Sequence, residues 1–245
     1  MTIASDVTGD GPAVLLLHST VCDRRMWDPQ VPVLAAAGHR VIRCDLPGYG
    51  ESPVPAQPYD EAAAVAGLLG AEPATVVGAS GGGRVALEIA GRWPERVTRL
   101  ALLCTAMAGH EPSDRLREFS DREDALLEAG DVAGATSLNV DLWLGPEADD
   151  QTRERVRAMQ HHAFDVQLAA PEETGPLHTD PDLARITAPT LLISGAHDLP
   201  DFREIAIHLA GVLPGARHLE LDWAGHLPSL ERPDLLNPVL LDFLG

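Results

Sequence analysis

The chain has 245 residues, enough for one large domain with a substantial core, and its 45% hydrophobic and 22% charged content is typical of a soluble globular protein. Its net charge of −19 argues against nucleic acids and anionic membranes as partners, because both attract clustered basic residues. All 18 basic residues are arginine, which excludes Schiff-base chemistry, a lysine anchor for pyridoxal phosphate and a Walker A phosphate loop.

Strand and helix patterns alternate along the first part of the chain. Apolar runs predict strands near 3–7 and at 13–18, 40–45, 74–77 and 97–104. Helical patterns lie between them, at about 27–37, 60–69 and 81–92. This alternation predicts an α/β fold in which a mostly parallel, doubly wound sheet has helices on both faces.

The alternation stops after residue 108. From there to residue 185 no strong strand pattern occurs, and helices are expected at 115–129 and 151–168. Strands then return at 190–194 and 216–221, with helices at 202–213 and 233–244. We therefore predict a core domain formed by 1–108 and 186–245, with a helical lid inserted at 109–185.

The cysteines and the N-terminal residues bear on location. Cys22, Cys44 and Cys104 are an odd set without metal-site spacing, which predicts reduced thiols in a cytoplasmic protein. The first residues lack the basic and apolar regions of a signal peptide, and no apolar stretch is long enough to span a bilayer. Nothing in the sequence indicates an oligomeric state.

A catalytic motif lies between the strand at 74–77 and the helix at 81–92. Gly78-Ala79-Ser80-Gly81-Gly82 fits G-x-S-x-G, in which a sharp strand-to-helix turn exposes a nucleophilic serine. The alternative is dinucleotide binding, because residues 81–86 also fit G-x-G-x-x-A. That motif requires an acidic residue after the next strand, which here ends in Cys-Thr-Ala. The flanking elements therefore favour a nucleophilic Ser80.

A serine nucleophile needs a base and an orienting carboxylate. His226 follows the last expected strand, and Asp198 follows the strand at 190–194, so both belong at the sheet edge that carries Ser80. Asp201 is the alternative acid. The order Ser80, Asp198, His226 is the one expected for an α/β-hydrolase arrangement.

Over nearly its whole length the chain resembles α/β-hydrolase fold serine hydrolases, and within them the 3-oxoadipate enol-lactonase-like and small esterase-like members. The resemblance rests on the motifs His18-Ser-Thr, Trp27-Asp-Pro-Gln30, Asp45-Leu-Pro-Gly-Tyr-Gly-Glu-Ser52, Gly78-x-Ser80-x-Gly82, Gly195-x-x-Asp198 and Gly225-His226. It implies an oxyanion hole formed by the backbone N–H groups of Thr20 and Gly81, with no cofactor and no metal. The chain departs from the family pattern at Ser19, where glycine is usual, and its short N-terminus predicts fewer than eight strands.

Pocket residues are expected from the lid and from the loop after Cys104. They are Trp143, Met107, Phe164 and Met159, each of which fits lid or core packing equally well. Because the chain has only ten aromatic residues, the pocket is expected to be mostly aliphatic. His161 and His162 are adjacent on a helix and therefore face different ways, which argues against a metal site.

These patterns predict a cofactor-independent serine hydrolase that cleaves a carboxylic ester or lactone of a small, largely apolar metabolite. The same fold and site would also suit a C–C bond hydrolase, a cofactor-free perhydrolase or lyase, or a biosynthetic cyclase. A further alternative of another class is a receptor-like protein that binds a ligand without turning it over.

Overall fold

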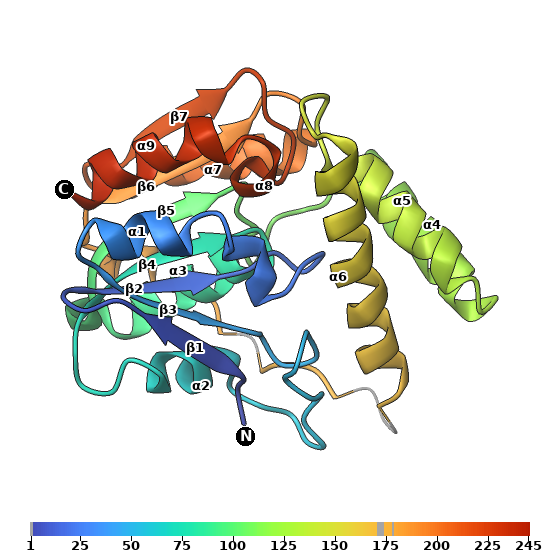
Figure 1. Cartoon of the computed structure of the whole chain (residues 1–245), viewed down its shortest axis with the longest axis horizontal. Helices are drawn as coiled ribbons and strands as arrows, with labels where there is room; N and C mark the ends of the chain where they lie inside the picture. The colour runs from blue at the N-terminus through green and yellow to red at the C-terminus, as the bar shows by residue number, and fades with distance from the viewer. Residues whose placement is uncertain (1, 171–173, 178) are drawn as a thin grey trace.

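A seven-stranded sheet forms the centre of the structure, a computed structural model that describes residues 2–170, 174–177 and 179–245 (Figure 1). The strand order is β1-β3-β2-β4-β5-β6-β7. The strands are β1 (Ser5–Thr8), β2 (Ala13–Leu17), β3 (Arg40–Cys44), β4 (Ala74–Ala79), β5 (Val97–Leu103), β6 (Thr190–Gly195) and β7 (Arg217–Leu221). The expectation of fewer than eight strands agrees with this sheet.

Six strands run parallel, and only β1 at the edge pairs antiparallel, with β3. The strand β4, which leads to Ser80, lies in the middle between β2 and β5. Because parallel strands end at one edge of a sheet, the loops after β2, β4, β6 and β7 meet there. These loops carry the residues of the predicted site.

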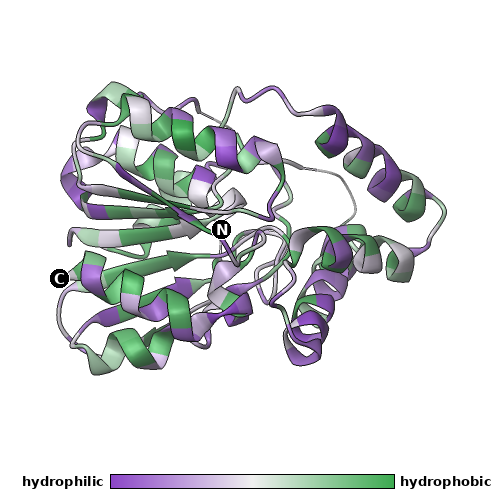
Figure 2. Cartoon of the chain, turned by 90° about the horizontal axis from the view of Figure 1, so that it is seen from above, coloured by the Kyte–Doolittle hydropathy of each residue, from purple (hydrophilic) through white to green (hydrophobic). Residues whose placement is uncertain are grey.

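Two hydrophobic cores lie on opposite faces of the sheet, because successive residues of a strand point to opposite sides. In β2, Val14 and Leu16 belong to one core, whereas Leu15 and Leu17 belong to the other. The first core is covered by α1 (Val31–Ala36), α8 (Pro228–Glu231) and α9 (Pro233–Leu244). The second is covered by α2 (Glu61–Gly67), α3 (Gly81–Arg92) and α7 (Pro200–Val212). Figure 2 shows hydrophobic residues concentrated in the strands and these flanking helices.

The helix expected at 27–37 is interrupted. Its first part is a 3₁₀ helix, η1 (Arg24–Trp27), and its second part is α1. Pro29 lies between them and has no backbone N–H to donate, so the helical hydrogen bonds cannot run through. Two further 3₁₀ helices are η2 (Pro94–Arg96) and η3 (Leu183–Arg185).

Among the described residues of the segment that has no strand pattern, the α-helices are α4 (Asp114–Glu128), α5 (Val132–Trp143) and α6 (Asp150–Leu168). They stand beside the sheet rather than on its faces (Figure 1). The expected helices at 115–129 and 151–168 agree with α4 and α6 within a residue. The helix α5 was not predicted, because Gly134 and scattered polar residues obscure its apolar side. Among the described residues no helix is both long and apolar enough to cross a membrane.

Candidate active site

Ser80 occupies a strained turn between β4 and α3. Its backbone has φ 50° and ψ −117°, in a region that residues other than glycine rarely adopt. The turn is possible because its neighbours lack side chains: a Cβ on Gly82 would lie 2.6 Å from the Leu17 carbonyl oxygen and closer still to that of His18. The motif therefore folds into the sharp turn that presents a serine at the end of a central strand.

The two expected oxyanion donors lie side by side. Gly81 is the first residue of α3, where a helix leaves its N–H groups without intrahelical acceptors. A Cβ on Gly81 would lie 2.5 Å from Cγ2 of Thr20 and 3.9 Å from its backbone nitrogen. The Gly82 N–H also donates to the His18 carbonyl oxygen at 3.1 Å, which joins the loop after β2 to the start of α3.

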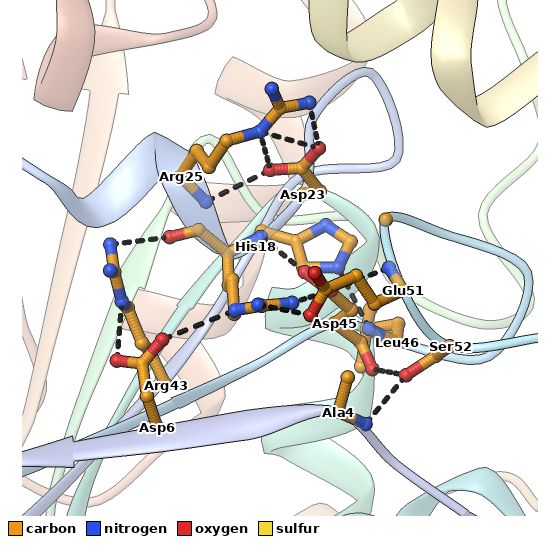
Figure 3. A network of polar contacts seen from close by, with 12 residues as sticks. Ala4, Asp6, His18, Asp23, Arg25, Arg43, Asp45, Leu46, Glu51 and Ser52 are labelled. Carbon is orange, nitrogen blue, oxygen red and sulfur yellow. Dashed lines mark hydrogen bonds and ion pairs between the residues drawn. The ribbon is translucent and has the colours of Figure 1, made fainter.

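His18 holds the loop that carries Thr20. Its Nε2 accepts from the Leu46 N–H at 2.8 Å, and its Nδ1 donates to the Ser19 carbonyl oxygen at 2.8 Å (Figure 3). Complete burial lowers the pKa of His18 below its usual value, although the Ser19 carbonyl opposes this effect. A neutral imidazole that donates with one nitrogen and accepts with the other satisfies both bonds. His18 therefore supports this loop through both ring nitrogens.

Asp45 fixes the neighbouring loop, which ends at Ser52. Its carboxylate accepts from the backbone N–H groups of Arg24 and Glu51, both at 2.8 Å, and pairs with the Arg24 guanidinium. The Ser52 hydroxyl donates to the Asp45 carbonyl oxygen at 2.8 Å (Figure 3). Asp45 and Ser52 therefore hold the turns of this loop.

His226 and Asp198 form a buried pair. The imidazole Nδ1 lies 2.7 Å from Oδ2 of Asp198, and the two side chains are 2% and 1% exposed. The other carboxylate oxygen of Asp198 accepts from the Leu199 N–H at 2.7 Å. The rings of Trp143 and Phe202 pack against the imidazole, with centroids 4.5 and 4.2 Å away.

Asp201, the alternative acid, has other partners. Its carboxylate accepts from the backbone N–H and the hydroxyl of Ser113, at 2.7 and 2.6 Å, and lies 3.1 Å from Nε2 of His110. Ser113 is the residue that caps α4. Asp201 therefore fastens the first lid helix to α7, and Asp198 is the acid in contact with His226.

Glu231 is a second buried carboxylate near His226 that the sequence reasoning missed. Its oxygens accept from the backbone N–H groups on either side of the histidine, Gly225 at 2.8 Å and Leu227 at 3.0 Å. Burial raises the pKa of Glu231, while these backbone bonds and a further one from Gly145 lower it. The sequence signal that could have indicated Glu231 is its position as a lone acidic residue in the mainly apolar stretch after His226.

Within the part of the chain that the structure describes, one group of side chains could offer ligands to a metal ion. Cys104, Asp198 and His226 offer donor atoms within 4.8 Å of one another. Burial raises the pKa of the Cys104 thiol well above its usual value, so the thiolate that a metal prefers is disfavoured. His161 and His162 do face different ways, toward Thr136 and toward the Gly50 carbonyl oxygen.

Two cavities lie next to each other at the predicted site. The smaller, of about 290 Å³, is lined by Ser80, His226 and mainly apolar residues: Thr20, Val21, Gly81, Arg84, Ala106, Leu116, Trp143 and Phe202. The larger, of about 660 Å³, shares Thr20, Gly81 and Arg84 with it and extends below the lid helix α6. The two cavities therefore form neighbouring parts of one site.

The predicted pocket residues divide between lining and core. Trp143 lines the smaller cavity and Phe164 the larger. Met159 is buried in the first hydrophobic core, Met107 packs against the second, and neither lines these cavities. The larger cavity combines an aliphatic lining with polar groups of Tyr49, Tyr59, Glu61, Arg84 and Gln167.

Comparisons with known proteins give one consistent answer. A model of the alpha/beta hydrolase family matches residues 14–239. The structure of a hydrolase from Pseudomonas aeruginosa is 32% identical with a TM-score of 0.80, over 99% of this chain and 94% of that one. The enol-lactonase from Burkholderia xenovorans is 26% identical with a TM-score of 0.80, over 99% and 96%. A pimeloyl-acyl-carrier-protein methyl ester esterase from Neisseria meningitidis is 29% identical, over 94% and 92%.

Proposed function

The chain belongs to the alpha/beta hydrolase family, and on this premise we propose that it hydrolyses a carboxylic ester or lactone through Ser80, His226 and Asp198. The observation that carries the proposal is the buried 2.7 Å contact between His226 and Asp198, in a cavity that His226 shares with Ser80 on its strained turn. The similarity to an enol-lactonase and to a methyl ester esterase supports this class of substrate.

The proposed reaction proceeds through an acyl-enzyme. His226 takes the proton from the Ser80 hydroxyl as its oxygen attacks the carbonyl carbon, and Asp198 keeps the Nδ1–H of the imidazole in place. The N–H groups of Thr20 and Gly81 stabilise the negative charge on the carbonyl oxygen. His226 then returns the proton to the leaving alcohol, and a water molecule, activated in the same way, releases the acid and restores Ser80.

The position of His226 indicates which cavity each half of the substrate occupies. The leaving oxygen must lie beside the imidazole that protonates it, and His226 lines the smaller cavity. The alcohol half therefore occupies the smaller, mainly apolar cavity, and the acyl half extends from the oxyanion donors into the larger one. A small apolar alcohol fits this division, as does the similarity to a methyl ester esterase.

Residues 109–185 act in this proposal as a lid over both cavities. Leu116 and Trp143 from the lid line the smaller cavity, and Leu127 and Phe164 line the larger. The Asp201–Ser113 contacts hold the beginning of α4, and the Gln167 side chain donates to the Gly48 carbonyl oxygen at 3.2 Å at the end of α6. The lid thus shields the reacting carbonyl from bulk water.

Intact mass after incubation with a fluorophosphonate probe tests the proposal. One adduct is expected on the wild type and on Ser120→Ala, which removes an exposed hydroxyl of α4. No adduct is expected on Ser80→Ala. An adduct on Ser80→Ala, or none on the wild type, would contradict the assignment. In the second case, stoichiometric binding of a ligand without turnover would favour the receptor-like alternative.

A further inference from the structure

The lid residue Trp143 contacts the proposed base in two ways. Its backbone carbonyl oxygen accepts from the N–H of His226 at 3.0 Å. Its indole packs against the imidazole of His226 and also lines the smaller cavity. The indole is therefore part of the wall of the cavity that is proposed to hold the alcohol half of the substrate.

A hydrogen bond inside the lid sets the direction of this indole. Nε1 of Trp143 donates to Oδ1 of Asn139 at 2.9 Å, and Asn139 lies one helical turn earlier in α5. Asn139 is 2% exposed, so bulk water has little access to the bond. Phe119 of α4 and Phe202 of α7 meet the indole in edge-on contacts, with centroids 5.1 and 5.6 Å away. The ring is thus packed by aromatic neighbours and oriented by Asn139.

The amide of Asn139 is itself oriented by its surroundings. The lid helices α4 and α5 lie side by side (Figure 1). Nδ2 of Asn139 donates to the carboxylate of Glu123 on α4, and to the Ala135 carbonyl oxygen at 3.0 Å. An indole N–H can only donate, and a carboxylate can only accept. One orientation of the amide therefore satisfies all these partners, with its oxygen toward Trp143 and its nitrogen toward Glu123.

We propose that Asn139 is a positioning residue that acts through Trp143: its bond to the indole N–H keeps the ring in the wall of the smaller cavity and restricts the enzyme to esters of short alcohols. This inference rests on the proposed function and specifies the alcohol part of its substrate class. Without the Asn139 acceptor, the buried indole N–H is left unpaired, which favours a turn of the ring toward another acceptor. A turned ring no longer bounds the cavity in the same place, so longer alcohols gain room.

A series of esters of one acid with methanol, ethanol, n-butanol and benzyl alcohol tests the selectivity, with Asn139→Leu beside the wild type. Leucine keeps the branched shape of asparagine but offers no acceptor. The acyl group is constant and the intrinsic reactivity of each ester is the same for both proteins, so a change in the methyl-to-butyl ratio of kcat/KM reports the alcohol cavity. We expect the wild type to favour the methyl ester and Asn139→Leu to lower the ratio by about tenfold, as the loss of one buried hydrogen bond allows.

A double-mutant cycle tests whether Asn139 acts through the indole. Trp143→Phe keeps an aromatic ring at this position but has no N–H to donate. In that background Asn139→Leu should leave the ratio unchanged, because the bond that it removes is already absent. Thr136→Val is the control in the same helix: the buried Thr136 hydroxyl donates to the Val132 carbonyl oxygen at 2.7 Å, and Thr136 lines neither of the two cavities. Thr136→Val should keep the wild-type ratio.

The outcomes separate the two proposals. If Ser80 is labelled and the methyl ester is hydrolysed, but Asn139→Leu keeps the wild-type ratio, only the role of Asn139 is overturned. An equal change in the ratio for Thr136→Val overturns it as well, and so does a full effect of Asn139→Leu in the Trp143→Phe background. If Ser80 is not labelled and no ester is cleaved, both proposals fail. If Asn139→Leu does not fold, Asn139→Ala takes its place in both backgrounds, with the same expected results.

Discussion

Replacing Asp198 with asparagine tests how the acid acts. One carboxylate oxygen accepts from the Leu199 N–H, and the other accepts from Nδ1 of His226. An asparagine that keeps its carbonyl oxygen on Leu199 turns its NH₂ group toward the imidazole. That group donates, so Nδ1 must become the acceptor and Nε2 must carry the proton. The histidine is then in the wrong tautomer to accept the proton of Ser80.

The expected loss follows from this reversal. A wrong tautomer with intact geometry lowers kcat of a serine hydrolase by about 10⁴-fold, which is about 5 kcal/mol of transition-state stabilisation. KM should change little, because neither cavity loses a lining atom. The folded state loses one charge-assisted hydrogen bond, worth about 1.5–3 kcal/mol, so the variant should remain folded at room temperature.

Steady-state hydrolysis of a methyl ester and the rate of fluorophosphonate labelling measure the effect, with urea unfolding as the check on folding. Asp201→Asn is the matched control, because Asp201 is also buried but contacts Ser113 and His110 instead of His226. It should keep most of its activity and lose about 1 kcal/mol of stability through the weakened cap of α4. A kcat for Asp198→Asn within tenfold of the wild type, or an equal loss in Asp201→Asn, would refute the reasoning.

Three further predictions follow from the surroundings of the site. Gly82→Ala should lower the free energy of unfolding by at least about 1–3 kcal/mol in urea titration, because the new Cβ meets backbone carbonyls that cannot move aside; unchanged stability would count against the described turn. Glu231→Gln places an NH₂ group against one of the two backbone N–H groups beside His226. We expect kcat to fall while KM stays unchanged. A change in KM alone would contradict a role of Glu231 in positioning His226. Burial keeps the pKa of His18 in the folded protein below its usual value of 6.5. The unfolded chain therefore binds more protons than the folded protein as the pH falls. The free energy of unfolding should decrease as the pH drops from about 7.5 to about 5.5. The midpoint of urea unfolding should change less with pH in His18→Gln than in the wild type. An equal change in both proteins would contradict this prediction.

Local sequence determined the fold class and indicated the proposed nucleophile. A buried strand repeats every two residues and a helix every 3.6, so the runs around Ser80 predict a strand, a turn and a helix from near neighbours alone. The glycines at 78 and 82 predict the turn directly, because a side chain at either position would collide with neighbouring backbone atoms. The expected number of strands follows from the same local signals, whereas the order of the strands in the sheet does not.

Contacts between distant segments decided the rest. Asp198 and Asp201 are three residues apart in one loop region, where the sequence favoured Asp198 but left Asp201 open, and only the folded chain shows that one meets His226 and the other meets Ser113. Glu231 was missed because its partners are backbone N–H groups, which every sequence contains. The contact between Glu61 and Arg84 in the larger cavity joins two different helices, and periodicity within one element carries no information about what faces it across a cavity. Sequence patterns report local backbone preference and which side of an element is buried, whereas pairing between side chains depends on the packing of elements far apart in the chain.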